Sequence, residues 1–289
     1  MNKTLKIFLY LIYTVAITVF FLYHLFPSDE VKAHIQRSLG RLNPDYSVRI
    51  DRIRPTFPPG LHFNAVGLFH RNGLLLEVKK INITAKIFSL FRAQKTMSFQ
   101  GSTYGGILDG VVHISKDRAA QRFQVDARIS GVQIQDISVL QKMPVKPSSG
   151  VLEATVLLDT RPTREPLKTN LTISDAELKL PPTFFTPGSL SFRSIRLEMA
   201  LDQKTVQVRK SLISGRQIDG QFSGSVLFRN PLDKSILNLT GTIQPHPQFL
   251  ANLEKTLAVN IFPKRRVGEK GFPIRIYNTI EAPKFALRP

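Results

Sequence analysis

Strict alternation of apolar and polar side chains is the feature that most limits how this sequence can fold. The two kinds of side chain alternate without exception in Ile81–Ile87, and the alternation recurs in Phe123–Ile129 and Ile195–Leu201. Successive side chains of a β-strand point to opposite faces of a sheet, so a period of two predicts strands with one apolar face. We therefore expect a mainly β protein.

Clusters of glycine, proline and serine separate these strand-like segments, as in Pro147–Gly150. Their spacing suits successive antiparallel strands joined by turns. Glycine also allows positive φ at turns and lets a strand bend sharply. On this basis we predict structural turns or bends at Gly105, Gly106, Gly110, Gly220 and Gly224.

A sheet that is apolar on one side must cover that side with a second sheet, a helix or a ligand. The sequence predicts few helices, so the strands are expected to form either a closed sandwich or a curved, open trough. The candidate lining of an apolar groove is Ile81, Ile83, Ile87, Phe123, Val125 and Ile129. The alternative for all six is an ordinary closed core.

The N-terminal segment is of a different kind. No formal charge occurs from Ile7 to Phe26, and a helix of that length, at about 1.5 Å per residue, would match the roughly 30 Å of a bilayer core. The run ends in Phe26-Pro27 rather than in the small residues of a signal-peptide cleavage site. It therefore predicts an uncleaved transmembrane helix, with residues 1–27 as stub and anchor and residues 28–289 as a β-rich domain.

A short amphipathic helix is predicted directly after this segment. Val31, Ile35, Leu39 and Leu42 follow one another at helical spacing and form an apolar stripe. Such a helix could lie on the membrane surface or plug the open end of the β-domain. We favour the plug.

The sequence offers little for catalysis. It contains no cysteine, which excludes thiol chemistry, disulfides and thiolate metal sites. Its six histidines show no metal-binding spacing, and the nucleotide-binding and nucleophile-elbow motifs do not occur. We expect a non-enzymatic protein with no cofactor and no metal.

The net charge of +19 is compatible with an anionic neighbour, although the interpretation we favour is that the basic side chains form ordinary solvated faces. Lysine and arginine are scattered through the strand-like segments rather than clustered with stacking aromatics, which disfavours nucleic acid. In a periplasm, the partners suited to this charge are phospholipid headgroups, lipopolysaccharide phosphates or acidic proteins.

Several short motifs follow one another in a characteristic order. They are Phe26-Pro27, Phe57–Phe63, Tyr104-Gly105-Gly106 with Gly110, Asp219–Gly224, Leu239–Pro245, Phe272–Ile276 and Pro283. In this order they resemble the protein N family of bacterial type II secretion systems (GspN), in particular its delta-proteobacterial form. The closing strands are similar to those of AsmA-like and TamB-like proteins, although Asn278 stands where those families usually have glycine.

The resemblance implies an AsmA-like curved sheet and a single-pass inner-membrane protein whose large domain is periplasmic. It implies a non-catalytic component of type II protein secretion, with other secretion-system components as partners. The alternative function is an AsmA/TamB-like lipid-binding or lipid-transfer module with an apolar groove and phospholipid as partner. An open apolar trough would favour lipid handling, and a closed sandwich would favour scaffolding.

Overall fold

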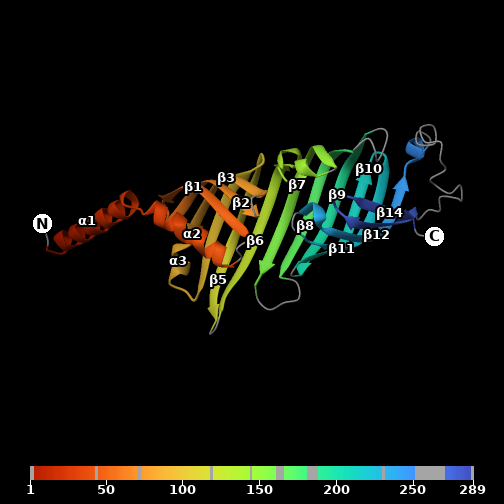
Figure 1. The fold of residues 1–289 in the computed structure, drawn as a ribbon. Coiled ribbons are helices and arrows are strands. Elements are labelled where there is room, and N and C mark those ends of the chain that lie inside the picture. Colours follow the sequence, from red (N-terminus) through yellow and green to blue (C-terminus); the bar gives the residue numbers. More distant parts are fainter. Residues whose placement is uncertain are drawn as a thin grey trace.

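The computed structural model describes residues 3–42, 45–70, 73–117, 120–143, 145–160, 166–180, 188–202, 204–229, 232–250 and 271–287. Its dominant element is one antiparallel sheet in which each strand pairs with its neighbours in sequence (Figure 1). The strands are β1 (Tyr46–Thr56), β2 (Gly60–His70), β3 (Gly73–Ala85), β4 (Gln94–Thr103), β5 (Gly106–Asp117), β6 (Ala120–Gln133), β7 (Lys146–Asp159), β8 (Leu167–Lys179), β9 (Ser189–Asp202), β10 (Thr205–Gly215), β11 (Ile218–Leu227), β12 (Ile236–Pro245), β13 (Phe272–Thr279) and β14 (Pro283–Leu287).

The helices are few and mostly short. They are α1 (Lys3–His24), α2 (Ser28–Leu42), α3 (Ile87–Leu90) and the 3₁₀ helices η1 (Ile134–Asp136), η2 (Leu140–Lys142) and η3 (Leu232–Lys234). The mainly β, antiparallel fold expected from the alternation is confirmed. The sheet is open, because β1 and β14 are its two edges and β1 is not paired with β14 in the described part of the chain.

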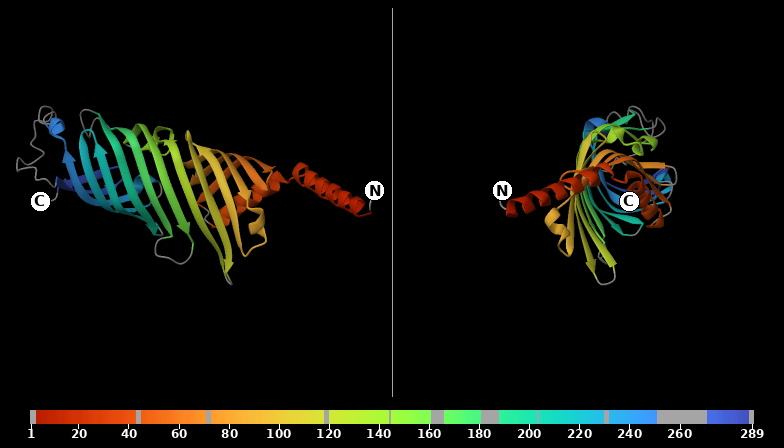
Figure 2. Two further views of the ribbon diagram at one scale, coloured as in Figure 1. Left: turned by 180° about the vertical axis from the view of Figure 1, so that it is seen from behind. Right: turned by 90° about the vertical axis from the view of Figure 1, so that its left-hand side faces the viewer.

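The sheet is rolled about the long axis of the molecule (Figure 2). Helix α2 lies in front of the strands in Figure 1, and the strands cover it when the molecule is seen from behind in Figure 2. The sheet therefore curves around the side on which α2 lies.

Helix α2 packs on the β1 end of this curved sheet. Its Val31 and Ile35 pack against a buried cluster formed by Ile50, Ile53 and Phe63 of β1 and β2. Gln36 Nε2 donates a hydrogen bond to the carbonyl oxygen of Val48, and Lys32 Nζ donates one to that of Asp51. These bonds occupy backbone acceptors of an edge strand, which would otherwise be open to pairing with another chain.

Helix α1 projects from the α2 end of the molecule (Figure 1). Its side chains from Ile7 to Tyr13 are all exposed, so it is apolar all round its circumference. Among the described residues, no helix reaches the length and apolarity that a membrane span requires. The structure thus has a helix where one was predicted, but it gives no support to its transmembrane character.

Three predicted glycine turns lie in strands. Gly110 is inside β5, and Gly220 and Gly224 are inside β11. The β4–β5 connection is the turn that was expected, with Tyr104 and Gly105 at φ values of 46° and 80°. Two consecutive positive φ angles define a tight hairpin turn whose twist matches that of the flanking strands. Gly106 follows as the first residue of β5.

Candidate functional site

The strand register joins apolar residues into one row across the whole sheet. Starting from β1, each residue of the row is the direct partner of the next, and Thr169 is its one polar side chain. The row, called the apolar row below, consists of Pro55, Leu61, Ile83, Phe99, Gly110, Ala127, Val156, Thr169, Met199, Val208, Gly224, Leu239, Ile276 and Phe285.

A second apolar row runs parallel to the first, two residues away along each strand and therefore on the same face of the sheet. It crosses β4 to β12 and contains no polar side chain. Its members are Met97, Val112, Val125, Leu158, Leu167, Leu201, Val206, Val226 and Leu237. The face that carries both rows is called the apolar face below.

The opposite face is polar at the neighbouring positions. The residues that precede or follow the apolar row along each strand pair into a row of hydrogen-bonding and charged side chains. This polar row runs from β1 to β10 through Arg54, His62, Asn82, Gln100, Asp109, Arg128, Thr155, Asn170, Glu198 and Lys210. On β10 a register shift after Val208 brings Lys210, two residues farther along, into the row. The two faces of the sheet are thus sharply different in polarity.

The cover on the apolar face is uneven. The helices that pack on the sheet do so at β1, β4 and β7, and the fully buried cluster lies under α2. Farther along the sheet, Val156, Met199 and Leu239 of the apolar row remain only half-buried. An apolar surface that extends across so many strands indicates a ligand or partner that completes it.

Five of the six predicted lining residues lie on this face. Ile81 and Ile83 pack against the cluster under α2, so they belong to a covered core. Phe123, Val125 and Ile129 lie on β6 in register with residues of β5 that share the apolar face, and Phe123 remains exposed.

Ile87 was wrongly placed by the sequence pattern. Strand β3 ends at Ala85, and Ile87 is the first residue of α3 with 44% of its surface exposed. Buried Ser89 enforces this ending, because its hydroxyl donates to the carbonyl of Lys86 and accepts from the N–H of Thr96. The chain therefore turns out of the strand before the alternation ends.

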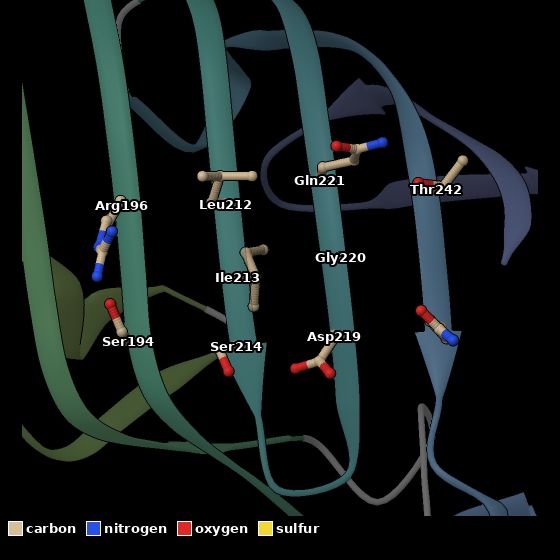
Figure 3. A pocket seen from close by; sticks show the side chains of 10 residues that line it. Ser194, Arg196, Leu212, Ile213, Ser214, Asp219, Gly220, Gln221 and Thr242 are labelled. Carbon is tan, nitrogen blue, oxygen red and sulfur yellow. The ribbon is translucent and has the colours of Figure 1, made fainter. Parts of the chain in front are cut away.

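A separate, open depression of about 630 Å³ lies over β9 to β12, at positions that continue the polar face (Figure 3). Arg196, Gln221, Thr242 and Gln244 line it together with Asp219. This depression could not be predicted from the sequence, because its residues are brought together only by pairing between strands.

Asp219 at one end of this depression is hydrogen-bonded to His246. Its Oδ2 lies 2.9 Å from Nε2 of His246, and its Oδ1 accepts from the N–H of Gly215. Burial raises the pKa of the Asp219 carboxyl, but the hydrogen bonds from His246 and Gly215 outweigh this effect and leave the pKa below its ordinary value. Among the described residues, no cluster of three or more potential metal ligands occurs.

Together, the meander topology and the polarity of the two faces define a class of protein: a single, open, rolled antiparallel sheet with one continuous apolar face. In comparisons with known proteins, no family model, no curated protein and no solved structure matches the chain.

Proposed function

We propose that this protein binds acyl chains of lipids along the apolar face of its sheet and has no catalytic role. The observation that carries the proposal is the apolar row, which crosses fourteen strands with a single polar side chain. At about 4.8 Å per strand such a row extends over roughly 60 Å. This length exceeds the roughly 30 Å of a bilayer core, so it would accommodate more than one acyl chain.

The energetics favour such a ligand. Burial of one methylene contributes about 0.8 kcal/mol, so ten methylenes on the apolar face contribute about 8 kcal/mol before the cost of ordering the chain. This is the scale of a micromolar dissociation constant. A headgroup left in solvent at the rim would meet the excess of positive charge on the protein.

The proposal includes attachment to a membrane through α1. All side chains from Ile7 to Tyr13 are exposed, and a helix that is apolar on every side is stable when lipid or protein surrounds it. Attachment requires that these side chains be buried in lipid, and not that the helix cross the bilayer. An inner membrane with the sheet in the periplasm is the location that the sequence resemblance implies.

The predicted role in type II secretion rests on the sequence resemblance, whereas the open apolar face favours lipid handling over a closed scaffold. The two hypotheses differ in phenotype. Loss of a secretion component would stop the export of secreted proteins, and loss of a lipid-binding module would change the lipid composition of the envelope.

Native mass spectrometry of the full chain, extracted from membranes in mild detergent, tests the proposal. We expect adducts with the masses of phospholipids that persist after gentle detergent removal. Protein that is lipid-free after extraction, and takes up no phospholipid when it is added back, would contradict acyl-chain binding.

A further inference from the structure

Exposed phenylalanine side chains gather at the end of the sheet from which α1 projects. Phe57 lies in the turn between β1 and β2, and Phe88 and Phe91 belong to α3 and the residue that follows it. Their surfaces are 83%, 85% and 88% exposed. With Ile87 they form what is called the aromatic patch below, and none of the four contributes to the apolar face.

Hydrogen bonds hold the two parts of the patch together. The N–H of Ala85, at the end of β3, donates to the carbonyl of Pro59 in the β1–β2 turn at 3.0 Å. The N–H of Lys86 donates to the carbonyl of Thr96, which closes the loop that carries α3. The phenylalanines therefore project from two anchored turns of neighbouring strands.

The patch lies at the same end as the base of α1. The hydroxyl of Tyr23 in α1 donates to the carbonyl of Thr56, the residue next to Phe57. Both α1 and α3 lie at this end of the molecule in Figures 1 and 2. If α1 is immersed in lipid, the aromatic patch faces the surface of the same membrane.

The charge of the residues around the aromatic patch indicates which sign of lipid charge suits it. Lys86, Arg92 and Lys95 are exposed around α3, and the segment 86–97 contains no acidic residue. The acidic residues Asp29 and Glu30 lie outside this segment, in the first turn of α2, which follows the base of α1 in sequence. Apolar rings flanked by lysine and arginine are the combination by which proteins bind the interface of an anionic bilayer.

We propose that the aromatic patch docks on the surface of an anionic phospholipid membrane and holds the α2 end of the sheet against it. The inference rests on the membrane attachment proposed above. It assigns to Phe57, Phe88 and Phe91 a contact with lipid that is separate from acyl-chain binding on the apolar face.

The chain contains no tryptophan, so a single tryptophan serves as a reporter. Phe57→Trp, Phe88→Trp and Phe91→Trp are each introduced into the full chain, with Tyr277→Trp as control. Tyr277 is also aromatic, with 37% of its surface exposed, but it lies on β13 at the other end of the sheet (Figure 1). The proteins are reconstituted into vesicles of phosphatidylcholine, with or without phosphatidylglycerol, in which bromine on the acyl chains quenches nearby tryptophan.

We expect quenching and a blue shift for the three patch reporters in vesicles with phosphatidylglycerol, and at least twofold less quenching for Tyr277→Trp. Lys86→Gln, Arg92→Gln and Lys95→Gln, combined in the Phe88→Trp protein, should reduce its quenching at least twofold. Quenching of Phe88→Trp that is no stronger than that of Tyr277→Trp would overturn the proposal. Equal quenching with and without phosphatidylglycerol would contradict an anionic partner.

A second copy of the chain would give a different result. In that case the emission of Phe88→Trp would shift with protein density in the vesicles but would not respond to bromine, and the proposal would be overturned. Native mass spectrometry of the same samples reports acyl-chain binding independently. The two measurements therefore distinguish a patch that does not dock on the membrane from an apolar face that does not bind acyl chains.

Discussion

Ile81 on β3 and Ile129 on β6 lie in one line across the sheet, because Ile81 pairs with Gly101, Gly101 with Leu108, and Leu108 with Ile129. The line continues through Ala154 and Leu171 to Leu197. It begins in the core under α2 and extends onto the part of the face that lies beyond it. A covered core and an exposed apolar surface are thus two regions of one face.

The first prediction concerns ligand binding on that face. Leu171 lies on the apolar face, and its neighbour Asn170 lies in the polar row. A carboxylate at position 171 would have to lose water when an acyl chain binds. Leu171→Glu should therefore lower phospholipid occupancy in native mass spectrometry at least tenfold.

The matched control is Asn170→Glu, which adds the same charge one residue away on the opposite face. It should leave occupancy unchanged, with far-ultraviolet circular dichroism showing that both variants are folded. Equal losses in the two variants would argue against a binding surface confined to the apolar face.

The second prediction concerns the covered core. Ile53 is buried in the cluster under α2, so Ile53→Ala should lower the free energy of unfolding by about 2 to 5 kcal/mol through lost burial and a residual cavity. Ile107→Ala changes the same side chain at a position 48% exposed and should cost less than about 1 kcal/mol. Urea unfolding measures both values, and a cost for Ile53→Ala as small as that for Ile107→Ala would disprove the packing of α2.

The mainly β, antiparallel fold could be predicted from the sequence because the alternation persists through most strands. The alternation could not show local irregularities in the pairing. Asp51 and Ala65 fall outside the β1–β2 pairing, with Ala65 at a φ of 46°. This pair of unpaired residues brings Ile50 and Ile53 onto the same face, although their spacing in sequence places them on opposite faces.

Individual side-chain hydrogen bonds also escaped prediction from the sequence. The ending of β3 before Ile87 depends on the hydrogen bonds of Ser89 to Lys86 and Thr96. The pair of Asp219 and His246 joins the start of β11 to the residue after β12. Neither contact has a periodic signal: the first is a local arrangement of the α3 loop, and the second depends on the pairing of β11 with β12.

The third prediction concerns the hairpin between β4 and β5. Gly105 has a φ of 80°, which L-residues with a side chain rarely adopt, and a Cβ there would lie 3.2 Å from Gln133 Cγ. Gly105→Ala should therefore lower the free energy of unfolding by about 1 kcal/mol or more. For comparison, a Cβ at Gly73 meets only the carbonyl oxygen of His70 at 3.4 Å, without positive φ, so Gly73→Ala should be close to neutral in the same urea titration.

The fourth prediction follows from the lowered pKa of Asp219. A carboxyl whose pKa is lower in the folded state contributes stability above its unfolded pKa of 3.8. That contribution is lost as the pH falls through the lower, folded value. The urea midpoint of the wild type should therefore fall more steeply below about pH 4 than that of Asp219→Asn. Parallel pH profiles for the two proteins would show that the hydrogen bonds of Asp219 with His246 and Gly215 do not favour the charged carboxylate.

Lipid crosslinking from two adjacent positions of β7 tests the central claim most directly. Val156 belongs to the apolar row and Thr155 to the polar row, so a photoreactive amino acid at each position samples opposite faces of one strand. We predict that irradiation of cells produces phospholipid adducts from position 156 and at least tenfold fewer from position 155. Folded protein that yields no more adduct from position 156 than from position 155 would contradict a lipid-binding apolar face.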